Sequence, residues 1–168
     1  MMKVVVDTNL WISFLLHGKV YKSLLDIISR RDVLLVLTKY SIDELVSVAS
    51  RPKFAKYIPQ EALNAFVDFL LENGEFYTLL EIPKRCRDPK DDYLLELASI
   101  AGADFILSGD DDLLSLHHIG SCRIIRLSDF QILKEYAGTL NEPRRILMFN
   151  LKFNSNLMDA SRYPNRVR

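Results

Sequence analysis

The sequence predicts an α/β fold in which helices cover a parallel sheet of about five strands. Short runs of β-branched and apolar residues alternate along the chain with longer segments of helical period, which is typical of parallel strands joined by helices. The chain has 168 residues, of which 49% are hydrophobic, so it fits one domain with a single buried core. No segment approaches the roughly 18 uninterrupted apolar residues that a membrane span requires.

Local sequence signals give the expected limits of the strands and helices. Strands are predicted at residues 3–6, 33–37, 76–80, 103–107 and 123–127. Helices are predicted at residues 20–30, 39–50, 59–72 and 89–102, and from residue 128 onward. Asp88 before Pro89 is typical of a capped helix start, while Asn73-Gly74 and Gly102 are typical of helix ends.

Residues 138–168 are predicted to form a basic extension, partly disordered, beyond a domain of residues 1–137. The alternation of strands and helices ends near Gly138, although residues 146–153 have the composition of an extra strand. The extension contains six basic and two acidic side chains, which gives it a charge of +4 and leaves −4 on the domain. The whole chain is neutral, so its charge does not indicate nucleic-acid binding as a strongly basic composition would.

The cysteines, the histidines and the N-terminus argue against several other classes of protein. Cys86 and Cys122 form no disulfide framework, and no cysteine or histidine falls at zinc-ligand spacing, so both thiols are interpreted as structural. The N-terminal segment has a run of only three valines, which is too short for the core of a signal peptide. We therefore expect a soluble protein of the cytoplasm.

Four acidic residues are predicted to meet at one edge of the sheet. Asp7 directly follows the first strand and Asp110 follows the fourth, and ligands of open α/β sheets bind at the carboxyl ends of the strands. Glu44 lies about two turns into the helix after the second strand. Asp92 lies in the first turn of the helix before the fourth strand, so both helices bring a carboxylate toward the same edge.

Such a cluster of carboxylates predicts a metal site. Like charges that lie close together raise one another's pKa, and a bound cation compensates them. Oxygen ligands without nitrogen or sulfur favour Mg²⁺ or Mn²⁺. Ions of this kind activate water and stabilise the charge that develops on a phosphate, so hydrolysis of a phosphodiester needs no Ser, Cys or His nucleophile.

Four segments resemble the acidic motifs of PIN-domain proteins in their order and spacing. They are VVVDTN at residues 4–9, DEL at 43–45, DPKDDYLLELA at 88–98 and ADFILSGDDDL at 103–113. The resemblance covers residues 2 to about 137, and the first and last motifs together are the most specific. It implies a three-layer α/β/α sandwich around a central parallel sheet, and cleavage of single-stranded RNA that depends on Mg²⁺ or Mn²⁺.

The resemblance also implies partners for the chain. PIN-domain proteins frequently form homodimers, and many small prokaryotic members resemble the toxin of a toxin–antitoxin pair, which a cognate antitoxin protein neutralises. The implied function of this chain is therefore an endoribonuclease that acts as such a toxin.

Carried over residue by residue, the resemblance assigns the members of the site. The catalytic and metal-binding quartet corresponds to Asp7, Glu44, Asp92 and Asp110. Asn9 and Ser108 correspond to polar positions that support the quartet, and Asp112 corresponds to an additional metal-binding acid.

Two runs of adjacent acids leave alternatives open. Asp92 is preferred to Asp91 because the apolar residues that follow then have the offsets of the family. Asp111 is the expected bystander between its two acidic neighbours. Each acid also has a structural alternative: Asp7 and Asp91 could cap a turn or a helix, and Glu44 could complete a capping box or be solvated.

Basic and aromatic side chains near the motifs are candidates for contacts with RNA. Arg51 and Lys53 follow the helix of Glu44, and Arg85 and Arg87 precede the helix of Asp92, so either pair could contact phosphates. The alternative for these basic residues is an ordinary solvated surface. Three aromatic residues could stack on bases, although two of them fit a core position better. The candidates are Tyr40, Trp11 and Phe14, of which Trp11 and Phe14 are the expected core residues.

Two other functions compete with a nuclease. An aspartyl-phosphate phosphatase would also carry an aspartate after the first strand, but Asn9 stands where such enzymes generally have a second acid. A PIN-like fold without activity could serve as an RNA-binding or protein-interaction module. Loss of the acids would indicate such a module, and none of the four is lost here.

Overall fold

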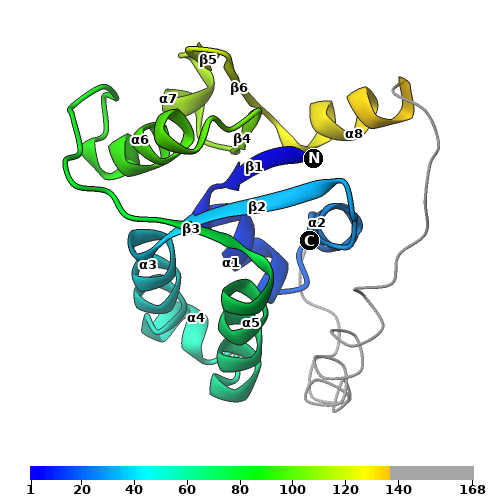
Figure 1. Cartoon of the computed structure of the whole chain (residues 1–168). Helices are drawn as coiled ribbons and strands as arrows, with labels where there is room; N and C mark the ends of the chain where they lie inside the picture. Colours follow the sequence, from blue (N-terminus) through cyan, green and yellow to red (C-terminus); the bar gives the residue numbers. More distant parts are fainter. Residues whose placement is uncertain (137–168) are drawn as a thin grey trace.

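The computed structural model describes residues 1–136, and the predictions for the extension at 138–168 lie outside this part. A single sheet has the strand order β3-β2-β1-β4-β6-β5 (Figure 1). Five strands are parallel, as predicted, and the short strand β5 pairs with β6 in the antiparallel direction. The strands are β1 (Met2–Val6), β2 (Val33–Thr38), β3 (Glu75–Tyr77), β4 (Phe105–Leu107), β5 (His118–Ile119) and β6 (Cys122–Ile125).

Within residues 1–136, the five predicted helices are present together with three further ones that were not fully predicted. The predicted ones are α2 (Tyr21–Ile28), α3 (Lys39–Ala49), α5 (Gln60–Asn73), α6 (Asp92–Ala101) and α8 (Leu127–Tyr136). The others are α1 (Thr8–Leu15), α4 (Pro52–Ala55) and α7 (Asp111–Leu114), with a 3₁₀ turn η1 (Pro89–Asp91) before α6. Six of the eight residues of α1 are buried, and the two least buried ones, Asn9 and Ser13, lie four apart on one face.

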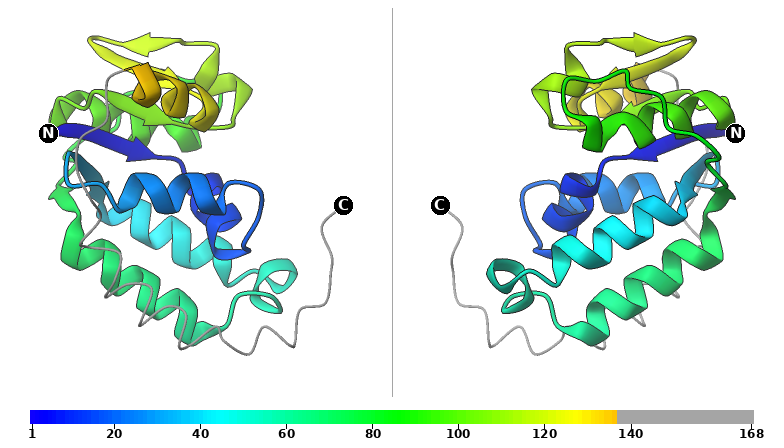
Figure 2. Two further views of the ribbon diagram at one scale, coloured as in Figure 1. Left: turned by 90° about the vertical axis from the view of Figure 1, so that its right-hand side faces the viewer. Right: turned by 90° about the vertical axis from the view of Figure 1, so that its left-hand side faces the viewer.

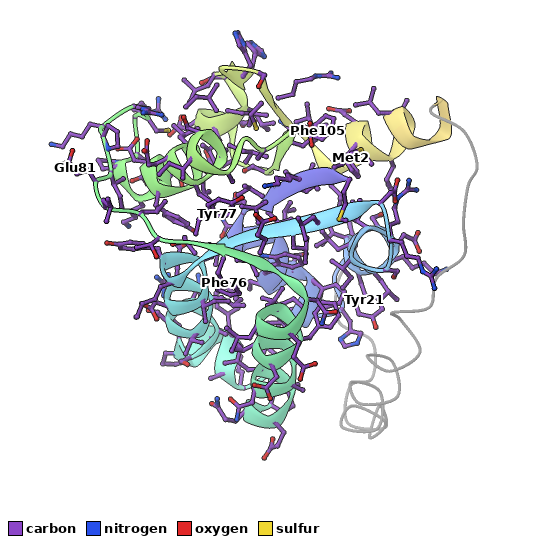
Figure 3. The ribbon with its side chains drawn as sticks, in the orientation of Figure 1. Met2, Tyr21, Phe76, Tyr77, Glu81 and Phe105 are labelled. Atoms are coloured by element: carbon purple, nitrogen blue, oxygen red, sulfur yellow. The ribbon has the colours of Figure 1, made fainter. Side chains whose placement is uncertain are left out.

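Helices cover both faces of the sheet, which confirms the three-layer α/β/α sandwich. Val4 and Val6 of β1 pack with α1, α2, α3, α5 and α8 on one face, while Val5 packs with α6 and α7 on the other. Figure 2 shows the sheet between α6 on one side and α3 with α5 on the other. At the β4 position labelled in Figure 3, Phe105 contacts Phe130 of α8 edge to face, with ring centroids 5.2 Å apart. Within the described residues, no helix is long and apolar enough to cross a membrane.

Gly74 lies between α5 and the edge strand β3, at a position where no side chain fits. A Cβ atom at this position would overlap the Leu37 side chain and lie 2.8 Å from the carbonyl oxygen of Leu70. We expect Gly74→Ala to lower the free energy of unfolding by about 1–3 kcal/mol, the usual cost of overpacking. Urea denaturation measures this effect. Gly109→Ala is the matched control, since a Cβ there meets nothing within 4 Å, and an equal loss in both variants would contradict the explanation.

Candidate functional site

Asp7 lies where β1 ends and α1 begins, and it is 4% exposed. One carboxylate oxygen accepts a hydrogen bond from the backbone N–H of Asn9 at 3.1 Å, which caps the helix. The other accepts a hydrogen bond from the hydroxyl of Ser108 at 2.6 Å. Burial raises the pKa of Asp7, the two hydrogen bonds oppose this rise, and the charges of Glu44 and Asp110 add to it.

Ser108 connects Asp7 to the next acid of the site. It is fully buried directly after β4, and its hydroxyl oxygen accepts a hydrogen bond from the backbone N–H of Asp110 at 2.9 Å. Asp110 caps α7 by accepting a hydrogen bond from the backbone N–H of Asp112 at 2.7 Å. The two strand ends therefore place Asp7 and Asp110 beside one buried hydroxyl, at the sheet edge that the sequence indicates. Asn9 supports Asp7 through its backbone, while its own side chain is exposed.

Glu44 is held by two hydroxyl groups that the sequence did not single out. Its Oε2 accepts hydrogen bonds from the hydroxyl of Thr8 at 2.7 Å and from the hydroxyl of Tyr93 at 2.6 Å. Thr8 and Tyr93 are both buried and belong to α1 and α6, so three helices meet at this carboxylate. The capping-box alternative for Glu44 is wrong, because Thr38 and not Ser41 is the N-cap of α3, and the hydroxyl of Ser41 accepts the reciprocal hydrogen bond from the backbone N–H of Thr38.

The adjacent aspartates before and at the start of α6 have different surroundings. Asp92 is 1% exposed, and its Oδ1 accepts hydrogen bonds from the backbone N–H groups of Arg85 at 2.8 Å and Cys86 at 2.6 Å. Asp91 is partly buried, and its pKa is raised to about 7 by burial first and then by the charges of nearby acids, among them Asp7, Asp110 and Glu44. Asp91 therefore lies in the field of Asp7, Asp110 and Glu44, while Asp92, which the sequence favoured, fixes the preceding loop through one of its two carboxylate oxygens.

The last two acids of the run after β4 are paired with arginines. Arg87 binds both carboxylate oxygens of Asp112, from its Nε at 3.1 Å and from a terminal nitrogen at 2.7 Å. Asp111 is exposed and pairs with Arg126 at 2.8 Å, in agreement with its expected role as a bystander. Both oxygens of Asp112 are thus engaged, so a metal could bind there only in competition with Arg87.

A model of the PIN-domain family matches residues 3–112 of this chain, more than half of its length. The chain belongs to the PIN-domain family. No curated protein and no solved structure matches it. PIN domains are generally nucleases and typically use divalent metal ions. All four carboxylates that share one electrostatic field lie within the match.

The donor groups of this PIN domain fit a hard divalent cation. Among the described side chains, no basic residue forms an ion pair with Asp7, Glu44, Asp91 or Asp110. Their mutual repulsion is therefore left without a compensating charge, and carboxylate oxygens are the ligands that such cations prefer. Within residues 1–136, however, no three His, Cys, Asp or Glu side chains are already grouped as a metal-binding set. The chemistry of the donors therefore fits such a cation, while their present arrangement is not a formed metal-binding set.

The basic candidates of the PIN domain differ in their availability. Arg85 forms a partly buried ion pair with Glu96 at 2.9 Å, so its guanidinium is already used inside the domain. Arg51 is exposed at the start of α4, and the amine of Lys53 lies over the ring of Phe54, 4.6 Å from the centroid. Arg87, whose side chain is 85% exposed, is the basic candidate that contacts the acidic run after β4.

The aromatic candidates separate into core and surface residues. Trp11 and Phe14 are 1% and 0% exposed, which confirms that they belong to the core. Tyr40 is 49% exposed in the first turn of α3, and its ring is stacked on that of Tyr93.

Proposed function

We propose that this PIN domain is an endoribonuclease that hydrolyses phosphodiester bonds of single-stranded RNA with Mg²⁺ or Mn²⁺. The observation that supports this most is the group of four carboxylates, Asp7, Glu44, Asp91 and Asp110, none of which has a basic partner among the described residues. Burial raises the pKa of Asp7 and of Asp91, and the charges of other acids of the group raise both further. The repulsion within such a group costs stability, which the helix-capping hydrogen bonds of Asp7 and Asp110 offset only in part.

Each acid has a distinct part in the proposed site. Ser108 fixes Asp7 and orients the backbone of Asp110, so these two carboxylates are the rigid members. Glu44 is fixed through one oxygen, which leaves Oε1 for the cation or for the attacking water. Burial and the neighbouring acids raise the pKa of Asp91 to about 7 without metal, so a bound divalent cation would stabilise its ionised form and use it as a ligand. A bound divalent cation would activate water and offset the charge that develops on the phosphate.

Cleavage in the presence of metal is the direct test of this proposal. We expect the purified protein to cleave a fluorogenic single-stranded RNA with Mg²⁺ or Mn²⁺, to stop in EDTA and to recover when excess metal is added. Single-stranded DNA and double-stranded RNA of the same sequence serve as comparisons for the substrate class. RNA binding without cleavage under any metal would instead support the non-catalytic module.

We propose that Arg87, whose ion pair with Asp112 is exposed to solvent on the arginine side and would open or be shared, contacts an RNA phosphate next to the acidic site. We expect Arg87→Ala to raise KM about threefold to tenfold and to lower the salt dependence of log KM by about 0.7, the share of one phosphate contact on a single strand. The measurement is KM at several salt concentrations. Arg126→Ala is the matched control, because Arg126 pairs with the exposed bystander Asp111. An unchanged salt dependence in Arg87→Ala would remove this residue from the substrate path.

The biological role that the resemblance implies is also a proposal. We propose that the chain is the toxin of a toxin–antitoxin pair, acts in the cytoplasm and forms a homodimer. Induced expression should then arrest growth, and a neighbouring gene product should relieve the arrest. Light scattering of the purified protein gives its oligomeric state, and full growth under strong induction would argue against the toxin role alone.

A further inference from the structure

Tyr40 is a half-exposed aromatic residue that is connected to the acidic site through Tyr93. It lies one helical turn before Glu44 on α3, and residues four apart share one face of a helix. Its ring is stacked on that of Tyr93, with centroids 6.2 Å apart and planes 27° apart. The hydroxyl of Tyr93 in turn donates to Glu44 at 2.6 Å. Tyr40, Tyr93 and Glu44 therefore form one continuous patch.

The exposure of Tyr40 differs from that of the ring beneath it. Tyr93 is 7% exposed, whereas Tyr40 is 49% exposed, so Tyr40 forms the outer layer of a two-ring stack. The backbone of α3 and the buried ring of Tyr93 limit the orientations that Tyr40 can adopt. A rigid aromatic face beside a reactive centre is the arrangement with which proteins stack bases of single-stranded nucleic acids.

The charges around Tyr40 favour a neutral ligand group over a phosphate. Lys39, its neighbour in sequence, forms an exposed ion pair with Asp43 one turn further along α3, so the two charges offset one another. The uncompensated carboxylates of the site repel phosphates that carry no cation. A nucleobase is uncharged, so it can bind to an aromatic ring at this edge without that electrostatic penalty.

We propose that Tyr40 is the platform on which a nucleobase of the RNA strand stacks, next to the phosphate that is cleaved. This inference rests on the proposed ribonuclease function and assigns a base-binding subsite to it. The subsite tolerates different bases, because every base offers a π-face. It positions the strand and takes no part in the bond-breaking step.

The test compares Tyr40→Ala and Tyr40→Phe with Tyr57→Ala. Tyr57 is the matched control, since it is an exposed tyrosine of almost the same exposure, 48%, that lies between α4 and α5. We expect Tyr40→Ala to raise KM about tenfold with little change in kcat, the phenylalanine variant to retain most of the affinity, and Tyr57→Ala to match the wild type. Circular dichroism and the melting temperature verify that all three variants are folded.

A second measurement isolates the contact with the base. The substrate is a series of RNAs with one abasic nucleotide, placed at each position in turn. At one position the missing base should raise KM of the wild type about tenfold but leave KM of Tyr40→Ala unchanged. The proposal is wrong if Tyr40→Ala has the KM of the wild type. It is also wrong if, at every position, the missing base raises KM of Tyr40→Ala by the same factor as it raises KM of the wild type. A fall in kcat alone would assign Tyr40 to holding Tyr93 and Glu44, and dissociation of a dimer with unchanged KM would assign it to a protein contact. A wild-type protein that cleaves no RNA would overturn the ribonuclease proposal first, and this subsite with it.

Discussion

Asp7→Asn is expected to reduce RNA cleavage by at least about a hundredfold and to leave the protein folded. Loss of a supporting partner of a metal ligand usually costs about tenfold to a hundredfold, and Asp7 is proposed to contact the ion itself. Asparagine has the same shape and keeps the oxygen that accepts from the backbone N–H of Asn9, so α1 should remain capped. The measurements are kcat with Mn²⁺, Mn²⁺ affinity by calorimetry, and the melting temperature.

Asp7→Asn is not expected to lower the melting temperature of the metal-free protein. Because burial raises the pKa of Asp7 in the folded protein, the ionised carboxylate opposes folding at any pH above that raised value. Without metal at pH 8, Asp7→Asn should therefore melt at the same temperature as the wild type or higher. Asp26→Asn makes the same chemical change at an exposed position of α2 and should alter neither activity nor stability. Full activity in Asp7→Asn would contradict the four-carboxylate mechanism.

The part of the fold that the sequence predicts well is the part with strong periodicity. The five parallel strands are apolar runs between clear turn signals, and α5 and α6 end at Gly74 and Gly102 as their signals indicate. Helix α1 was not predicted because it follows β1 directly at Asp7 and is only eight residues long, so its two least buried residues, Asn9 and Ser13, give too short a polar edge to recognise. Strand β5 was not predicted because two residues are too few to show an alternation.

The site was predictable where a strand end fixes a side chain. Asp7 and Asp110 follow β1 and β4, and adjacent parallel strands bring their carboxyl ends together without further information. The hydroxyls of Thr8 and Tyr93 were missed because their contacts with Glu44 join three helices, which no local pattern encodes. The sequence shows a threonine after Asp7 and a tyrosine near the start of α6, but it does not show that both bind Glu44.

Asp91 and Asp92 are expected to give opposite results when each is replaced by asparagine. Successive residues of a helix point about 100° apart, so sequence spacing does not decide which of two neighbours faces the site. Asp91→Asn should lower cleavage by about a hundredfold, as expected for a proposed metal ligand in the field of Asp7, Glu44 and Asp110. Asp92→Asn should retain most of the activity but lower the free energy of unfolding by about 1–3 kcal/mol, because it weakens two buried hydrogen bonds to a carboxylate.

The pH dependence of stability distinguishes the two residues independently of activity. The pKa of Asp91 rises from its ordinary value of 3.8 to about 7 on folding, so between these values the folded state holds a proton that the unfolded state has released. The stability of the metal-free wild type should therefore fall as pH rises from about 4 to about 7, and level off above this range. Asp91→Asn should lose this contribution, and saturating Mn²⁺ should restore stability to the wild type at pH 8.

Urea denaturation in EDTA at pH 5 and pH 8 measures that difference directly. The free energy of unfolding should differ less between pH 5 and pH 8 in Asp91→Asn than in the wild type. In Asp92→Asn it should be lower at both pH values but differ between them as much as in the wild type. If instead Asp92→Asn lost cleavage while Asp91→Asn kept both cleavage and the wild-type pH dependence, the assignment from the apolar offsets after Asp92 would be the right one. The backbone contacts of Asp92 to residues 85 and 86 occupy only its Oδ1, so Oδ2 would then be the oxygen that binds the cation.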